Sequence, residues 1–265
     1  MEKILRIVGV GDNCIDAYDQ LGEAYPGGNP VNVVVYMKRL GGEASYVGHV
    51  GTDDNGSLLI EALKNKGVDT SYVHIVDGKT AVTHVEIRNG ERILGDYDEG
   101  VMEFFHLKKE DVDFILTHDL VISALWGRME NEMKLFRDGG IRTAFDFATQ
   151  LEGDVVNAAI GYIDYAFFSA EEMPVDELKE CMATLFLRGP KLVIMTMGEK
   201  GSMVYDGTRY YQYGIEPCQV VDTMGAGDSY IAGFLYGILQ GKSIEESMKL
   251  GAKSSAVTLS YWGAW

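Results

Sequence analysis

The sequence predicts a single α/β domain in which helices cover a mostly parallel sheet. Short runs rich in β-branched and aromatic residues alternate with amphipathic stretches, as they do where parallel strands are joined by helical crossovers. The chain has 265 residues, of which 46% are hydrophobic, enough to bury one sizeable core. No internal repeat and no linker interrupts it, so we expect one domain over residues 1–265.

Local signals place the elements of this domain. Apolar runs predict strands at residues 4–10, 45–50, 120–124, 143–147, 165–168 and 192–196. Helical periodicity predicts helices at residues 30–40, 56–65, 131–137, 175–187, 226–239 and 243–260. The first helix has the clearest start, with Asn29 as the expected N-cap and Pro30 at the first helical position.

Two regions depart from the α/β alternation. From residue 72 to 98 the chain consists of short β-like pieces, and Asn89-Gly90 lies between two of them as a hairpin turn would. A second hairpin is expected around Asp206-Gly207. We therefore expect a small β excursion from the domain, formed by about residues 12–26 and 72–98.

Composition and charge exclude several functional classes. The net charge of −17 opposes broad contact with nucleic acid or anionic lipid, although a few local donors can still bind an anionic cofactor. No apolar run reaches 18 residues, so no membrane span is expected. The three cysteines are far apart and form no CxxC pair, which favours a reduced, cytoplasmic protein. The five histidines form no close ligand motif.

The segment around residues 222–235 contains the most informative motif. Gly225, Ala226 and Gly227 leave backbone amides unobstructed where a helix begins, and such amides together with the helix dipole bind anions. Asp228 lies at the same helix start. A carboxylate beside a phosphate cradle can accept the proton of a hydroxyl that attacks the phosphate. The alternative is a tight helix entry that Asp228 merely caps, and these residues alone do not decide between the two.

Two further glycine-containing segments are weaker signals. Residues 9–14 begin like a dinucleotide loop, but Cys14 replaces the third glycine and Asp12 would face the pyrophosphate. Asp12 and Asp16 instead suggest acceptors for sugar hydroxyls or a cation, or else a solvated turn. In residues 196–201, Thr196, Gly198, Lys200 and Gly201 could place a nucleotide against the backbone or form a tight turn. No P-loop motif is present.

Two segments of the sequence resemble the two signatures of the ribokinase-like (PfkB) sugar kinases, and they occur in the same order along the chain. Residues 222–228 (DTMGAGD) are similar to the carboxy-terminal signature of that family, and residues 27–32 (GGNPVN) to the amino-terminal one. The resemblance spans the chain and implies a three-layer α/β fold with a β-sheet lid over the sugar. It implies ATP-dependent phosphorylation with Asp228 as the base, residues 225–227 as the anion hole, and Gly27, Gly28 and Asn32 as sugar contacts.

Three shorter segments narrow the resemblance. Residues 11–16, 95–102 and 261–265 look like those of the fructoselysine 6-kinases of this family. The implied acceptor is the 6-hydroxyl of an N-linked fructosamine, with ATP as donor. A kinase for another ketose or amino-acid conjugate, such as fructose-asparagine, is the alternative, and a sugar-binding regulator without catalysis is the third hypothesis.

The acidic segment after an expected lid strand suggests contacts to a cationic substrate. Asp96, Tyr97 and Glu99 could bind the ammonium of a sugar-amine, or the acids could form a solvated loop. Arg92, in the expected lid strand before this segment, is a further expected substrate contact.

Metal ions and oligomeric state complete the expectations. The family commonly has N-x-x-E after a central strand to organise Mg²⁺; here Ser169 replaces the Asn and Glu172 keeps the acid. Asp222 is a candidate ligand for a monovalent cation such as K⁺. We expect ATP and Mg²⁺ as cofactors, a sugar-amine as substrate, no nucleic-acid or membrane partner, and a homodimer formed through the lid.

Overall fold

The computed structural model describes residues 4–88 and 91–265, apart from the side chains of residues 87–94. Its large sheet has nine strands in the order β13-β12-β11-β10-β9-β8-β1-β4-β5. The strands are β1 (Arg6–Val10), β4 (Glu43–Gly51), β5 (Asp69–Val76), β8 (Leu120–Ala124), β9 (Arg142–Asp146), β10 (Tyr165–Ser169), β11 (Leu192–Thr196), β12 (Ser202–Tyr205) and β13 (Tyr210–Tyr213). All pairings are parallel except those of the β12–β13 hairpin, which adds to β11 in antiparallel fashion.

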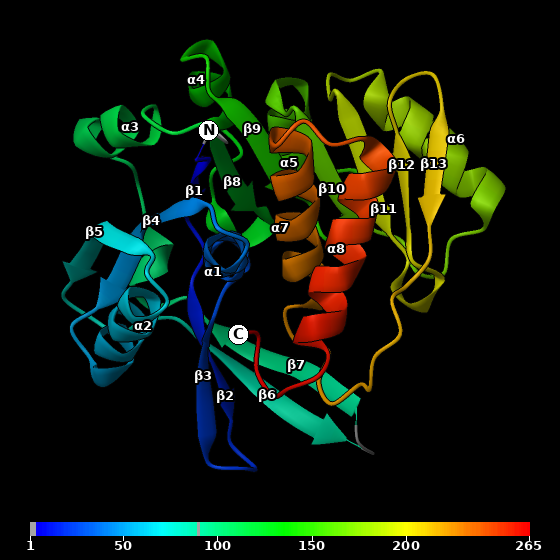
Figure 1. The fold of residues 1–265 in the computed structure, drawn as a ribbon. Helices are drawn as coiled ribbons and strands as arrows, with labels where there is room; N and C mark the ends of the chain where they lie inside the picture. The colour runs from blue at the N-terminus through cyan, green and yellow to red at the C-terminus, as the bar shows by residue number, and fades with distance from the viewer. Residues whose placement is uncertain (1–3, 89–90) are drawn as a thin grey trace.

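Helices cover both faces of this sheet, which gives three layers (Figure 1). One face packs against α1 (Asn29–Arg39), α2 (Asp54–Asn65), α7 (Ala226–Leu239) and α8 (Ile244–Thr258). The other packs against α3 (Lys109–Ile115), α4 (Met133–Asp138), α5 (Asp154–Ala159) and α6 (Val175–Phe186). The two cores follow the strand alternation: Ile7 belongs to the first face and Val8 to the second. The expected three-layer α/β fold is confirmed.

A separate four-stranded sheet projects from one end of the domain (Figure 1). Its order is β3-β2-β6-β7, with strands β2 (Cys14–Tyr18), β3 (Glu23–Gly27), β6 (Val82–Arg88) and β7 (Glu91–Asp98). The excursion expected at residues 72–98 therefore begins too early, because β5 pairs in parallel with β4 at the edge of the large sheet. Of residues 72–98, only β6 and β7 contribute strands to the small sheet, and they pair antiparallel as expected. The predicted turn residues Asn89 and Gly90 lie outside the described residues.

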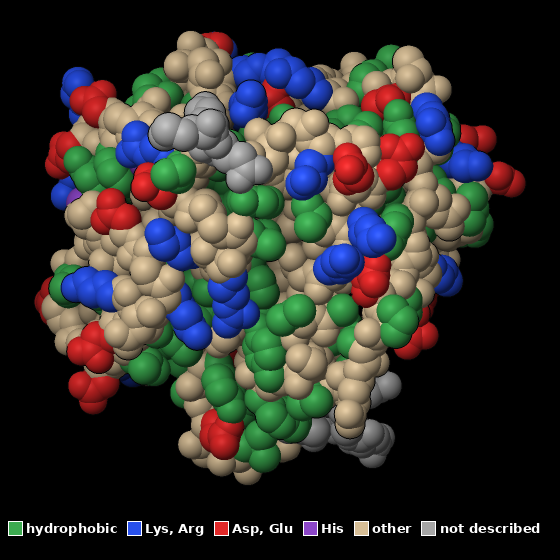
Figure 2. Space-filling model, in the orientation of Figure 1, with side chains coloured by type: hydrophobic (Ala, Val, Ile, Leu, Met, Phe, Trp, Pro, Cys, Tyr) green, Lys and Arg blue, Asp and Glu red, His purple; other side chains and the backbone are tan. Residues whose placement is uncertain are grey.

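The turn between β2 and β3 and residues 261–265 expose large hydrophobic side chains. Hydrophobic side chains gather in the lower part of Figure 2, where these segments lie. Leu21 and Trp262 are each 49% exposed. Within the described part of the chain, no helix is long and apolar enough to cross a membrane.

Candidate active site

Three carboxylates meet at one end of the large sheet, where parallel strands finish. Asp12 follows β1, Asp146 is the last residue of β9, and Asp228 lies in the first turn of α7. In open α/β sheets, ligands bind outside the carboxyl ends of the strands. The fold thus places these acids where a small-molecule site is expected.

Asn29 links all three acids. Its Nδ2 donates to Asp146 Oδ2 at 2.6 Å and to Asp228 Oδ1 at 2.7 Å. Its backbone N–H donates to Asp12 Oδ2 at 3.1 Å. The expectation that Asn29 is the N-cap of α1 is wrong, because the side chain is directed to the carboxylates and makes no capping bond. Gly28 is the N-cap, with φ of 103°, and a Cβ there would lie 2.6 Å from Asn13 Cα.

Asn32 provides a second donor to Asp228. Its Nδ2 donates to Asp228 Oδ2 at 2.6 Å, so each carboxylate oxygen of Asp228 accepts one amide hydrogen. Asn32 Oδ1 accepts from the indole Nε1 of Trp265 at 2.8 Å. Because an indole N–H can only donate, this bond directs the Asn32 oxygen to Trp265 and its NH₂ group to Asp228.

The surroundings favour the protonated form of Asp228. Burial raises its pKa to about 8, against the lowering effect of the Asn32 hydrogen bond, and the negative charges of Asp146, Asp12 and Asp16 raise it further. Burial also raises the pKa values of Asp12 and Asp146 to about 6 each. A carboxylate with a pKa near neutrality is suited to accept a proton from a substrate hydroxyl.

Sequence reasoning missed Asp146 and the bridging role of Asn29. Asp146 was expected only as part of a strand. Its position at the carboxyl end of a predicted parallel strand, the same signal that singled out Asp12, could have identified it. Nothing local in the sequence indicates that Asn29 reaches Asp228, which is 199 residues away.

The loop before α7 has the geometry of an anion cradle. Gly225 is the N-cap with φ of 72°, and a Cβ on it would lie 2.8 Å from Ala264 Cβ, so a glycine is required. A Cβ on Gly227 would meet nothing within 4 Å. The Ala226 N–H makes a long bond of 3.3 Å to Thr223 O. The first-turn amides of a helix have no intrahelical acceptors, so Gly227 and Asp228 present donors at this end of α7.

Several expected substrate residues lie beside these acids. Gly27 ends β3 and faces buried Asp16, since a Cβ on Gly27 would lie 2.3 Å from Asp16 Oδ2. The hydroxyl of Tyr97 donates to Asp12 Oδ1 at 3.4 Å. Asp96 is exposed and lies where the pairing of β7 with β6 shifts register.

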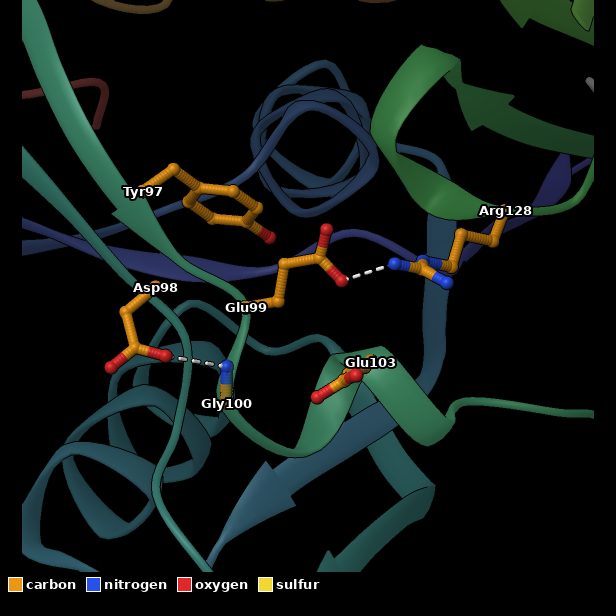
Figure 3. Close-up of a pocket in the computed structure, with 6 residues that line it drawn as sticks. All are labelled: Tyr97, Asp98, Glu99, Gly100, Glu103 and Arg128. Atoms are coloured by element: carbon orange, nitrogen blue, oxygen red, sulfur yellow. Dashed lines mark hydrogen bonds and ion pairs between the residues drawn. The ribbon is translucent and has the colours of Figure 1, made fainter.

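Glu99 lies in an acidic pocket beyond Tyr97. Its carboxylate forms an ion pair with Arg128, and the two side chains extend toward each other in Figure 3. The side chain of Arg92 lies outside the described residues, so its expected contact stays a prediction.

The expected nucleotide loop is a tight turn between β11 and β12. Thr196 Oγ1 and Ser169 Oγ are 3.1 Å apart, and Lys200 Nζ donates to the backbone oxygen of Glu171 at 2.7 Å. Gly198 and Gly201 both have positive φ. These contacts do not connect the loop with Asp228, and its nucleotide role stays a prediction.

The two expected metal-binding residues lie in different loops, one after β10 and the other before α7. Glu172 is exposed and lines a cavity of about 570 Å³ together with Ser169. Asp222 is buried, and its two oxygens accept the N–H groups of Met224 and Gly263 at 2.6 and 2.8 Å, which ties residues 261–265 to the α7 loop. The described residues contain no group of three or more His, Cys, Asp or Glu able to hold a metal ion.

Comparison with known families identifies the chain's relatives. Residues 12–264 match the model of the pfkB family carbohydrate kinases. The chain belongs to this family. A ribokinase of Arabidopsis thaliana, solved in complex with ribose and ATP, superposes with a TM-score of 0.87 at 22% identity, covering 98% of this chain and 94% of the other. This likeness confirms the ribokinase-like fold. The family assignment makes the protein an ATP-dependent sugar kinase.

Curated relatives are more similar in sequence. A fructoselysine 6-kinase of Shigella flexneri and one of Escherichia coli are each 41% identical, covering 97% of this chain and 98% of theirs. A fructosamine kinase of Bacillus subtilis is 34% identical, covering 98% and 93%.

Proposed function

We propose that this kinase transfers the γ-phosphoryl group of ATP to the 6-hydroxyl of fructoselysine. The observation that carries the chemical part is Asp228, whose two oxygens accept from Asn29 and Asn32 while burial and neighbouring charges raise its pKa to about 8. The 41% identity to fructoselysine 6-kinases over nearly the whole chain supports the substrate.

Two adjacent parts of the site act on the two reacting groups: Asp228 on the sugar hydroxyl and the α7 amides on the phosphoryl group. Asp228 accepts the proton as the 6-hydroxyl attacks the γ-phosphorus, and the two Asn amides hold the carboxylate in place. The bond from the γ-phosphorus to the β,γ-bridging oxygen breaks, and ADP leaves with that oxygen. The amides at the start of α7 stabilise the negative charge that develops on the transferred phosphoryl group. Buried Asp12, beside Asn29 and Tyr97, accepts from sugar hydroxyls, with Gly27, Gly28 and Asn32 forming the wall of the sugar site.

Mg²⁺ would bind together with ATP and would neutralise the negative charge of its phosphates. Glu172, which lines its cavity with Ser169, is the side chain we assign to holding the ion's water shell. A monovalent ion at Asp222 and a homodimer through the small sheet also remain proposals. The exposed Leu21 and Trp262 support the dimer.

The test is product identity. The protein is incubated with MgATP and fructoselysine, and the product is examined by proton-coupled ³¹P NMR. Coupling of phosphorus to the two C6 protons supports the proposal. Phosphate on another hydroxyl, or ATP hydrolysis without a sugar phosphate, contradicts it.

A further inference from the structure

A cationic side chain lines the pocket beyond Tyr97, and the binding of neutral sugar hydroxyls does not account for its charge. Its cavity measures about 470 Å³ and is lined by Tyr97, Asp98, Glu99, Gly100, Glu103 and Arg128. Arg128 is the one cation among these side chains, and it enters from the opposite side to Glu99 (Figure 3). A volume of this size is in the range of small-molecule sites.

This pocket adjoins the proposed sugar site. Tyr97 lines it and donates through its hydroxyl to Asp12. Gly127, the residue before Arg128, lies against the Gly11 backbone so closely that a Cβ on Gly11 would be 2.5 Å from Gly127 O. Arg128 therefore follows directly on a residue that packs beside the Asp12 loop.

The hydrogen bonds also show in which order the parts of the site follow one another, from Asp228 through Asp12 to the pocket. Asn29 joins Asp228 to Asp12, and Tyr97 joins Asp12 to the pocket. A sugar whose 6-hydroxyl reaches Asp228 directs its opposite end, C1, along this line. In a fructosamine, C1 carries the amine and hence the amino acid.

We propose that this pocket binds the zwitterionic end of the amino-acid part of the substrate, with Arg128 binding its carboxylate and Glu103 its ammonium group. This inference rests on the proposed function. The ion pair with Glu99 engages one guanidinium nitrogen, Nη2, and orients the group. A guanidinium has five N–H donors in a planar fork that matches a carboxylate, so it can engage a second acid. The substrates are then fructose conjugates of free amino acids, rather than simple fructosyl-alkylamines.

The test compares two substrates that differ only in the carboxylate. Fructoselysine has it, and the conjugate of fructose with cadaverine lacks it but keeps both nitrogens. Arg128 has φ of 55°, a conformation that asparagine tolerates, so Arg128→Asn removes the charge with little backbone cost. Arg209→Asn is the matched control, at an exposed arginine that pairs with Glu245 near β13, the edge strand of the large sheet.

We expect Arg128→Asn to raise KM for fructoselysine at least about tenfold, as loss of a charge-assisted hydrogen bond does, and to leave KM for the cadaverine conjugate within about twofold. Arg209→Asn should change neither. Equal effects of Arg128→Asn on both substrates, or no effect on either, overturn the assignment of Arg128 while leaving the proposed function intact. Failure of the unaltered protein to phosphorylate fructoselysine overturns both.

Discussion

Asp228 is the residue on which the chemistry depends. We expect Asp228→Asn to lower kcat by about 10²–10⁴-fold, because the amide cannot accept the hydroxyl proton. Sugar and ATP binding, measured by calorimetry, should remain. Asp146→Asn is the matched control, since it makes the same change at a carboxylate that also accepts from Asn29. A near-normal kcat for Asp228→Asn, or an equal loss in both variants, would place proton removal elsewhere.

The raised pKa of Asp228 sets the pH dependence. The base acts when deprotonated and its pKa is about 8, so kcat/KM should rise with pH until about pH 8 and fall about tenfold per unit below it. The charge of Asp146 contributes to the raised pKa, so Asp146→Asn should move this limb to lower pH. An acidic limb near pH 4, the ordinary range of an aspartate, would contradict the account.

The two glycines of the α7 loop have different roles. A side chain on Gly227 meets no protein atom within 4 Å, so Gly227→Val should fold normally yet lower kcat by crowding the anion, an effect of about 3 kcal/mol in comparable sites. Gly225→Ala should instead lower Tm, since its Cβ would collide with Ala264 and its φ is 72°. Circular dichroism and kcat measured together separate the two. A folded Gly227→Val variant with full kcat would mean that the loop is only a helix entry.

At the scale of elements, residues 261–265 link several parts of the site. Asp222 holds Gly263, Gly225 contacts Ala264, and Trp265 donates to Asn32. Trp265→Phe keeps an aromatic ring but removes the donor, so Asn32 is no longer held with its NH₂ group toward Asp228. We expect kcat to fall several-fold and the acidic limb of its pH profile to move upward, because the Asn32 bond lowers the pKa of Asp228.

A lower Tm without that pH shift would show that Trp265 only packs. Its ring is also stacked under Lys66 Nζ at 5.7 Å, a contact that Phe retains in weaker form.

The sequence predicts the buried elements better than the exposed ones. The strands at Leu120–Ala124 and Leu192–Thr196 match their predicted bounds because both are short and almost wholly buried runs. The strand β5 was assigned to the small sheet, since its half-exposed alternation is the same in an edge strand and in a lid strand. The helices α3 and α5, of seven and six residues, span too few turns to show a period.

In the candidate site, the sequence predicted the residues of local motifs but not the contacts between distant segments. Asp228 and the glycines near it were predicted because their chemistry and spacing are local. The Asn29 bridge and the Glu99–Arg128 pair were not, because they join residues from distant parts of the chain that only the folded sheet brings together.

At the scale of the whole molecule, the protein has the fold of its family, with a substrate pocket at the ends of the strands. The net charge of −17 makes an anionic ligand depend on local donors, which the α7 amides and Arg128 supply. A cationic or zwitterionic sugar conjugate suits the acidic remainder of the pocket, whereas a neutral ketose gains nothing from it.

The most direct test of the central claim is ADP release from MgATP with fructoselysine, fructose-asparagine, fructose and ribose, compared by kcat/KM at pH 8. We expect the highest value for fructoselysine and values lower by at least about tenfold for the two free sugars, which lack the charged end. A value for fructose or ribose equal to or above that for fructoselysine would contradict it.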